Sequence, residues 1–139
     1  MKVLIDTNVI LDFILRREPY YENAAKINIL SEKEYICGYI SASAVTDIFY
    51  IANKELKNKD TVLTLLKNIL KITHIASVTE GIIHEALDLK WDDFEDSVQY
   101  VTGQSISADY IITRNPKCFA DSQIEVISPE DFLNQIIQK

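Results

Sequence analysis

A short apolar run, Val3-Leu4-Ile5, lies near the start of the chain and is followed at once by Asp6-Thr7-Asn8. A run this short, with no polar position, predicts a fully buried strand. The polar residues then fall at the carboxyl end of that strand, where open α/β sheets place their ligand sites. Asp6 is therefore either a ligand for a cationic group or a cap for the following helix, because Asp and Thr are both good N-caps.

Strands and helices alternate along the rest of the chain. Apolar residues at helical spacing predict helices over 9–17, 20–32, 61–70 and 79–90. Further helices are predicted from Ser41 or Ser43 to about Leu56, from Asp92-Asp93 to about Gln104, and from Ser128-Pro129-Glu130 onward, with a polar turn at 57–60. Strands are predicted over 35–40, 74–76, 110–112 and, at an edge, 125–127.

This order of elements predicts the fold class. Three to five short strands separated by helices favour a central parallel sheet with helices on both faces, a three-layer α/β/α sandwich. The chain has 139 residues, which fits a single domain over 1–139.

Composition excludes several classes of protein. The net charge of −7 argues against a surface that grips nucleic acid by charge alone, although acidic metal ligands in a nuclease would contribute to such a deficit. No apolar run is long enough to cross a membrane, and Met1-Lys2 leads directly into the first strand, which leaves no room for a signal peptide. Cys37 and Cys118 have neither metal-ligand spacing nor a disulfide framework, so we expect a reducing, cytoplasmic location.

Acidic and amide side chains recur at positions that suit a site. Asp47 lies in an otherwise apolar helical stretch, where a carboxylate is rarely left unpaired, although an exposed helix position is the alternative. Asp93 and Asp96 share a helix face; Asp93 also suits the helix N-terminus through the dipole, whereas Asp96 lies deeper in the helix. Asn115 follows the strand 110–112, again at a carboxyl end.

Convergence of Asp6, Asp47 and Asp96 would bring strong repulsion unless a divalent cation lay between them. Oxygen ligands suit Mg²⁺ or Mn²⁺ better than zinc. Such a cation activates water and neutralises charge on a phosphate, so the pattern indicates phosphodiester hydrolysis. His74 and His84 lie far apart in sequence, and we expect surface or packing roles for both.

Four stretches in this order resemble the PIN domain, especially its bacterial and archaeal VapC-type group. They are Val3-Leu4-Ile5-Asp6-Thr7-Asn8, Asp93-Phe94-Glu95-Asp96, the stretch from Ala108 to Phe119 (Ala-Asp-Tyr-Ile-Ile-Thr-Arg-Asn-Pro-Lys-Cys-Phe), and Ser128-Pro129-Glu130-Asp131-Phe132-Leu133. The resemblance implies a parallel-sheet α/β/α fold, Mg²⁺- or Mn²⁺-dependent ribonuclease activity and frequent dimerisation. In toxin–antitoxin members it also implies inhibition by a small partner protein.

The resemblance also implies roles for particular acids. Asp6 matches the first acid of the family pattern, and Asp96 matches the third, with Asp93 as a possible neighbour in the cluster. Asp47 occupies the place of a usual Glu, so its carboxylate reaches one methylene less far. Asn115 falls where many members carry a fourth acid.

Other polar positions match supporting residues of the family site. Thr7, Asn8 and Thr113 resemble residues that support the acids, whereas Cys118 replaces an aspartate common before the phenylalanine matched by Phe119. Arg114 adjoins Asn115 at the strand end, where its planar guanidinium would grip an RNA phosphate. Lys54, Lys57 and Lys59 form a second basic patch or a solvated helix end.

Three functions stay open at this point. The first is a metal-dependent endoribonuclease, the toxin of a toxin–antitoxin pair, that acts as a homodimer on RNA and is inhibited by an antitoxin. The second is a PIN-fold protein with a weakened metal site that acts through binding alone. The short Asp47 and neutral Asn115 slightly favour this second function, whereas the intact Asp6 and Asp96 favour the first more strongly. The third is a small phosphatase or DNA nuclease with the same metal chemistry.

Overall fold

Five parallel strands form the centre of the protein in the computed structural model, which describes residues 1–119 and 122–138. The strands are β1 (Lys2–Ile5), β2 (Cys37–Ser41), β3 (His74–Ala76), β4 (Tyr110–Ile112) and β5 (Glu125–Ile127), in the order β3-β2-β1-β4-β5. The helices are α1 (Thr7–Ile14), α2 (Tyr21–Glu32), α3 (Ala42–Leu56), α4 (Lys59–Leu70), α5 (Glu80–Leu89), α6 (Phe94–Ser105) and α7 (Pro129–Gln138), with a 3₁₀ helix η1 (Pro116–Cys118). The predicted α/β/α sandwich with a parallel sheet is confirmed.

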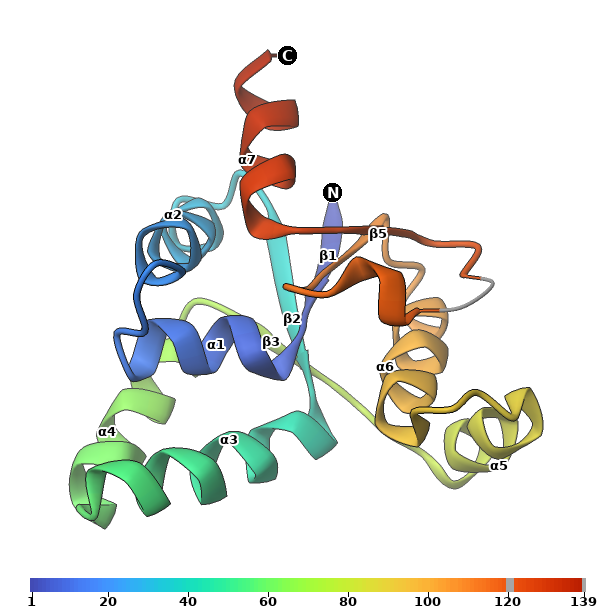
Figure 1. The fold of residues 1–139 in the computed structure, drawn as a ribbon, viewed down its shortest axis with the longest axis horizontal. Coiled ribbons are helices and arrows are strands. Elements are labelled where there is room, and N and C mark those ends of the chain that lie inside the picture. The colour runs from blue at the N-terminus through green and yellow to red at the C-terminus, as the bar shows by residue number, and fades with distance from the viewer. Residues whose placement is uncertain (120–121, 139) are drawn as a thin grey trace.

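The sheet is covered on both faces. Val3 and Ile5 point into a core shared with α1, α2, α3, α4 and α7, whereas Leu4 points into a second core shared with α5 and α6. Figure 1 shows these two helix layers on either side of the strands. Val3, Leu4 and Ile5 have no exposed surface, because successive residues of a strand point to opposite faces and both faces are packed.

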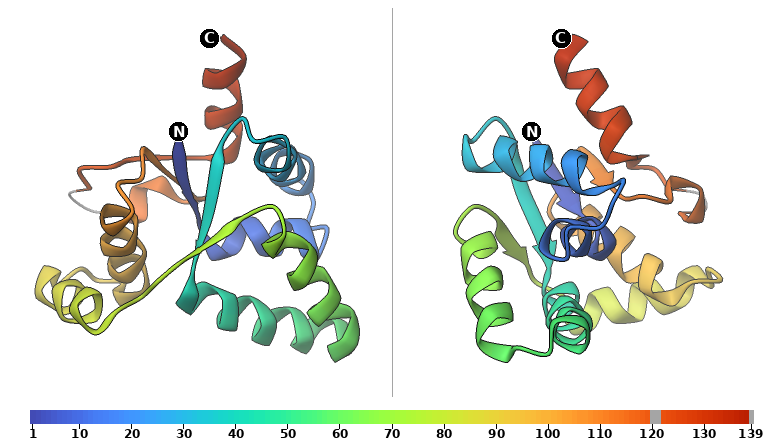
Figure 2. Two further views of the ribbon diagram at one scale, coloured as in Figure 1. Left: turned by 180° about the vertical axis from the view of Figure 1, so that it is seen from behind. Right: turned by 60° about the vertical axis from the view of Figure 1, so that its left-hand side comes forward.

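The amino and carboxyl ends of the strands lie at opposite ends of the sheet. In Figure 2 the start of β1 and the far end of α7 lie at the same end in both views, whereas the helices that follow β1 and β2 start at the opposite end. Because the strands are parallel, all their carboxyl ends lie at that opposite end. Within the described ranges no helix has the length and apolar character needed to cross a membrane.

The predicted strands 74–76, 110–112 and 125–127 match the observed ones, and the last is an edge strand as expected. Several other boundaries differ. Helix α1 covers Thr7–Ile14 instead of 9–17, because Asp6 caps its start and Arg16 adopts a left-handed conformation with φ of 51°. Strand β2 starts at Cys37 and not at residue 35, because the Tyr35 N–H donates to the Leu30 carbonyl and closes the end of α2.

The predicted polar turn at 57–60 is only half correct. Lys57 ends α3 in a left-handed conformation, but Lys59 and Asp60 already belong to α4. The Asn58 side chain accepts a hydrogen bond from the Thr61 N–H and caps α4 two residues earlier than the apolar pattern indicates. Ser41, not Ser43, caps α3, and the Ser128 side chain accepts from the Asp131 N–H at the start of α7.

The order of the strands predicts where a ligand site should lie. From β1 the chain moves to β2 on one side, whereas β4 pairs with β1 on the other, so the connections after β1 and β4 diverge. Ligand sites of open α/β sheets occur at such switch points, outside the carboxyl ends of the strands. The Asp6 N–H donates to the Ile112 carbonyl over 2.9 Å, which holds the residue after β1 beside the end of β4.

Candidate active site

A pocket of about 290 Å³ opens at the carboxyl ends of β1 and β4. Most of its polar lining comes from the residues just after these strands and from the first turn of α6. The lining residues are Asp6, Thr7, Asn8, Leu11, Ile51, Asp93, Glu95, Asp96, Thr113, Asn115, Cys118 and Phe119. Segments far apart in the sequence therefore contribute to one polar cavity.

Asp6 is the most constrained residue of this pocket. It is only 8% exposed, and its Oδ1 accepts hydrogen bonds from the Thr7 N–H at 2.8 Å and from Gln99 Nε2 at 2.9 Å. Its Oδ2 accepts a hydrogen bond from Thr113 Oγ1 at 2.8 Å. A carboxylate offers about four acceptor positions, so three donors orient Asp6 and leave capacity for a cation. Asp6 is thus both the N-cap of α1 and a lining residue of the pocket.

The start of α6 brings three acids to the opposite wall. Asp93 caps the helix by accepting a hydrogen bond from the Asp96 N–H, and Glu95 and Asp96 follow in the first turn. All three line the pocket. The predicted capping role of Asp93 and its predicted position in the acidic cluster therefore coexist, because a residue at a helix start can do both.

Two acids in this wall of the pocket, Asp96 and Glu95, have raised pKa values. Burial, followed by the negative charges of Asp93, Asp6 and Glu95, raises the pKa of Asp96 to about 7. The pKa of Glu95 is raised as well, by burial first and then by the charges of Asp47, Asp6 and Asp93. Acids that raise one another's pKa in this way form a site where a cation is favoured.

The other predicted ligands lie at different depths. Asn115 lines the pocket from the far side of β4 and is exposed. Asp47 lies on α3 at a half-buried position, close enough to Glu95 to raise its pKa, and among the described residues it is not part of the pocket lining. The structure therefore brings Asp6, Asp96 and Asn115 together and leaves Asp47 at the border.

The predicted supporting residues also gather here. Thr7, Asn8 and Thr113 all line the pocket, and Thr113 is almost fully buried because its hydroxyl is bonded to Asp6. Asn8 Oδ1 is buried, and within the described part of the chain it has no hydrogen-bond partner. A buried amide oxygen at a polar cavity is a natural acceptor for a bound water.

Two residues of this arrangement were missed in the sequence. Gln99 is 2% exposed and holds Asp6, yet a glutamine inside a helix is typical of an exposed position. Its place three residues after Asp96, on the same helix face, was the available signal. Glu95 lies in a stretch that resembles the PIN domain and was not predicted as a site residue, but it lines the pocket beside Asp96.

Arg114 lies between Thr113 and Asn115 but does not line the pocket itself. Its Nε atom is 3.1 Å from Asp12 Oδ2, and its guanidinium carbon lies 4.3 Å from the centre of the Tyr20 ring. The Arg114 side chain is 27% exposed, so part of the guanidinium faces solvent.

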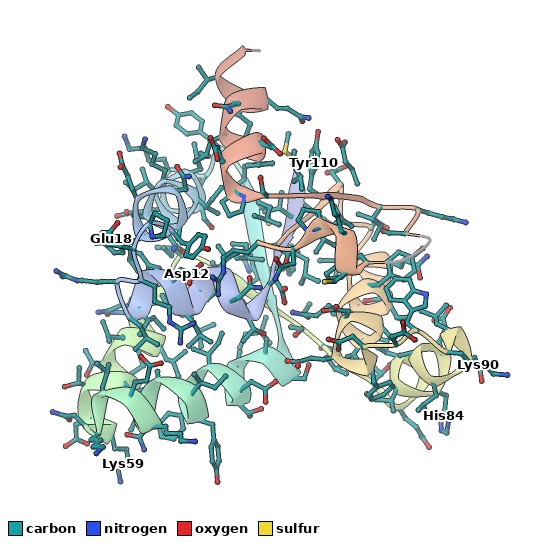
Figure 3. All side chains as sticks on the ribbon, in the orientation of Figure 1. Asp12, Glu18, Lys59, His84, Lys90 and Tyr110 are labelled. Atoms are coloured by element: carbon teal, nitrogen blue, oxygen red, sulfur yellow. The ribbon has the colours of Figure 1, made fainter. Side chains whose placement is uncertain are left out.

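The remaining sequence candidates lie outside the pocket. His74 is exposed and packs on the Tyr39 ring, and His84 is exposed on α5 near Glu80, as expected for surface roles. Figure 3 shows Lys59, His84 and Lys90 at the periphery and Asp12 near the centre of the molecule. Lys54 and Lys57 belong to the exposed end of α3.

The side chains that line the pocket can be compared with the ligands that a metal ion requires. Across 1–119 and 122–138, no three His, Cys, Asp or Glu side chains lie close enough together to hold a metal directly. Mg²⁺ nevertheless keeps several waters and uses only one or two carboxylates from the protein, so spaced carboxylates suit it. The buried Asn8 Oδ1 and the negative charges around Asp96 both fit a hydrated cation, and the carboxylate, amide and hydroxyl side chains of the lining supply oxygen ligands.

Comparisons with known proteins agree with the fold. A family model described as the PIN domain matches residues 2–117. No curated protein matches the chain.

Several solved structures share the fold. The crystal structure of DNA-bound VapBC from Salmonella typhimurium aligns with a TM-score of 0.72 and 15% identity, covering 93% of this chain and 98% of that one. VapBC2 from Rickettsia felis, bound to a promoter DNA fragment, aligns with a TM-score of 0.70 and 16% identity over 92% and 98% of the two chains. Mycobacterium tuberculosis VapC20, described as a sarcin-ricin-loop-cleaving toxin, aligns with a TM-score of 0.64 and 10% identity over 78% and 86%.

Proposed function

This chain belongs to the PIN domain family, and we propose that it is a Mg²⁺- or Mn²⁺-dependent endoribonuclease that hydrolyses RNA phosphodiester bonds. One observation carries the proposal: the Asp6 carboxylate is held by three hydrogen bonds and faces a wall of acids, where burial, followed by the charges of Asp93, Asp6 and Glu95, raises the pKa of Asp96 to about 7. Such an arrangement is costly for the protein alone, and a divalent cation relieves it.

Each residue then has a defined task. Asp6 and Asp96 would hold the cation, with Asn115 and Asp47 acting through bound water, since Asn115 is exposed and Asp47 lies at the border. When bound, the cation supplies an activated water and neutralises the charge that builds on the phosphate. Thr113 and Gln99 keep the Asp6 carboxylate in one orientation, which is the usual task of residues that hydrogen-bond to a metal ligand.

We propose further that the protein is the toxin of a toxin–antitoxin pair and works in the cytoplasm. The solved structures with this fold are described as VapBC and other toxin–antitoxin complexes, which supports a small antitoxin as partner. Exposed apolar side chains near the pocket support a homodimer. They are Tyr50, Ile51, Leu87 and Phe94, with exposures from 39% to 78%.

A binding role without catalysis is the second candidate. Asn115 replaces an acid, and within the described residues no three acids converge closely enough to ligate one ion directly. In that case the pocket would bind RNA or a partner without cleaving either.

Cleavage assays separate these functions. We expect purified protein to cleave a mixed RNA pool with Mg²⁺ or Mn²⁺, to lose this activity in EDTA, and to leave a matched DNA pool intact. The Asp6→Asn variant serves as the matched control, because it keeps the size of the side chain and removes its charge. RNA binding without cleavage by the parent protein would favour the second candidate, and DNA cleavage would assign a DNA nuclease instead.

The toxin role needs a separate test. Induced expression in bacteria should arrest growth for the parent protein and not for Asp6→Asn. Co-expression of a small reading frame beside the gene should restore growth and should form a complex with the toxin. Light scattering of the toxin alone measures whether it is a dimer.

A further inference from the structure

We propose that Asp12, Tyr20 and Arg114 form a preformed subsite for an RNA phosphate next to the acidic pocket. In this subsite Arg114 contacts the phosphate, and Asp12 and Tyr20 are positioning residues. The inference rests on the proposed ribonuclease function, and it assigns a path for the RNA chain away from the acids, over the end of α1.

Arg114 is held from two directions. Its Nε atom lies 3.1 Å from Asp12 Oδ2, and its guanidinium lies over the Tyr20 ring with a distance of 4.3 Å to the ring centre. Within the described part of the chain, no hydrogen bond or ion pair engages the Nη groups of Arg114, so these groups remain available to a ligand. These Nη groups form the planar fork that binds phosphate oxygens in bidentate fashion.

The Asp12 carboxylate is an unusual partner. Asp12 is only 1% exposed. Burial raises the pKa of its carboxyl, whereas the charges of Arg114 and Arg17 lower this pKa. Among the described residues, Asp12 Oδ1 and Arg114 Nε have no hydrogen-bond partner, so the contact is an ion pair without good hydrogen-bond geometry. A buried pair of this quality stabilises a fold little. What it does achieve is to hold the arginine in one orientation.

The two sequence neighbours of Arg114 both line the pocket. Thr113 before it donates a hydrogen bond to Asp6, and Asn115 after it lines the pocket. Thr113 Oγ1 also accepts a hydrogen bond from the Asn115 N–H at 3.4 Å. Arg114 therefore lies between two lining residues of the pocket, one of which is hydrogen-bonded to Asp6, and we expect its nearest anion to be a phosphate adjacent to the one being cleaved.

Net charge favours a local subsite of this kind. The protein carries −7, so a general positive field is unavailable to hold RNA. All three arginines of the chain, Arg16, Arg17 and Arg114, gather around the end of α1 and the start of α2. Arg17 is paired with Glu55 at 2.9 Å, whereas Arg114 is the arginine whose two sequence neighbours line the pocket.

RNA binding in EDTA tests the subsite independently of cleavage. The probe is a fluorescent single-stranded RNA pool, measured by anisotropy at several salt concentrations, with the parent protein and the variants Arg114→Ala, Arg114→Lys, Asp12→Asn and Tyr20→Leu. We expect Arg114→Ala to bind roughly tenfold or more weakly, because a charge-assisted hydrogen bond is lost. Its salt slope should fall by about 0.7, the value for one phosphate contact on a single strand.

The positioning residues should give a graded result. Arg114→Lys should recover part of the affinity, since it keeps the charge without the fork. Asp12→Asn and Tyr20→Leu should weaken binding and raise KM for cleavage while leaving kcat close to the parent value. Tyr20 is 43% exposed, so Tyr20→Leu keeps the fold even if Asp12→Asn unfolds the protein. Lys26→Ala is the matched control, because it removes one positive charge from an exposed position of α2.

The outcomes separate the two proposals. Equal RNA binding by Arg114→Ala, Lys26→Ala and the parent protein would overturn the subsite, even if the parent protein cleaves RNA, and would leave an acidic partner protein as the ligand of this surface. Weaker binding by Arg114→Ala and Tyr20→Leu, together with no cleavage by the parent protein, would support the subsite and overturn the ribonuclease function.

Discussion

Thr113 Oγ1 donates a hydrogen bond of 2.8 Å to Asp6 Oδ2, which joins the residue after β4 to the residue after β1. Both residues are more than nine-tenths buried, so this hydrogen bond is largely shielded from bulk solvent. The contact spans 107 positions of sequence and holds the two strand ends together at the pocket.

Thr113→Val should keep the fold and weaken the site. Valine has nearly the shape of threonine but lacks the donor, so Asp6 Oδ2 loses a partner in a buried position. We expect a loss of about 1–3 kcal/mol in the free energy of unfolding and a roughly tenfold or larger loss of metal affinity or activity. Urea unfolding and Mg²⁺ titration of cleavage measure both.

Thr102→Val is the matched control for this change. Thr102 is fully buried on α6, and within the described residues its hydroxyl has no partner. The same substitution there should leave activity unchanged and should be neutral or stabilising. Equal effects of the two variants on activity would show that Thr113 acts by packing alone.

Asp6→Asn should remove activity, with a loss of roughly a hundredfold or more, because a charged metal ligand is lost. Loss of the charge should also lower the pKa of Asp96, since Asp6 is one of the groups that raise it. An NMR titration of the Asp96 carboxyl in metal-free buffer measures this shift. Persistent cleavage by purified Asp6→Asn would falsify the assignment of the site.

The hydrogen bonds of Asp6 change the stability that we expect for the Asp6→Asn variant. Charge repulsion alone predicts a metal-free protein as stable as the parent or more stable. Asp6 also accepts three hydrogen bonds, and an asparagine amide offers one acceptor oxygen where the carboxylate offers two. The gain in the free energy of unfolding should therefore be smaller than the charge argument indicates.

Variants of Asp47 test whether this residue, at the border of the pocket, contributes to metal binding. If Asp47 acts through water, Asp47→Glu should retain or raise activity because the longer side chain reaches further. Asp47→Ala should raise the Mg²⁺ concentration needed for half-maximal cleavage roughly tenfold. Asp60→Ala, at an exposed position in the first turn of α4, controls for the loss of one negative charge. If all three variants resemble the parent, Asp47 is a solvated helix residue.

Much of the fold could be predicted from local pattern. Strand β4 matches its predicted bounds because a short apolar run with polar flanks marks a buried strand. Asp6 and Asp96 could be placed as candidates because strand ends and helix starts converge in parallel sheets. Asp6 caps α1, which was one of its two predicted roles, but the apolar pattern placed the start of this helix two residues too late.

The supporting residues could not be predicted in the same way. The bond from Gln99 to Asp6 spans 93 positions, and the ion pair of Asp12 with Arg114 joins a helix to a loop beyond β4. Asp12 lies in the apolar stripe of α1 and is 1% exposed, where the sequence pattern favours an uncharged side chain. Such pairs depend on tertiary packing, and local periodicity carries no signal for them.

Asp96 predicts how the stability of the metal-free protein depends on pH. Its pKa is about 7 in the folded protein and about 3.9 in an unfolded chain. Between these values the folded protein binds more protons than the unfolded chain, so the contribution of Asp96 to the free energy of unfolding falls as pH rises from about 4 to about 7 and is level above that range. Glu95 contributes with the same sign, because its pKa is also raised.

Asp96→Asn isolates this contribution. The asparagine side chain does not titrate, so the variant should gain stability over the parent as pH rises from 5.5 to 8, in EDTA, with urea unfolding as the measurement. Saturating Mg²⁺ should remove or reverse the difference, because the cation stabilises the ionised carboxylate of the parent protein. Asp88→Asn, at an exposed position of α5 outside the pocket, should follow the parent at every pH. A parallel pH profile of Asp96→Asn and the parent in EDTA would mean that Asp96 is ionised without cost, and the acids would then not need a cation.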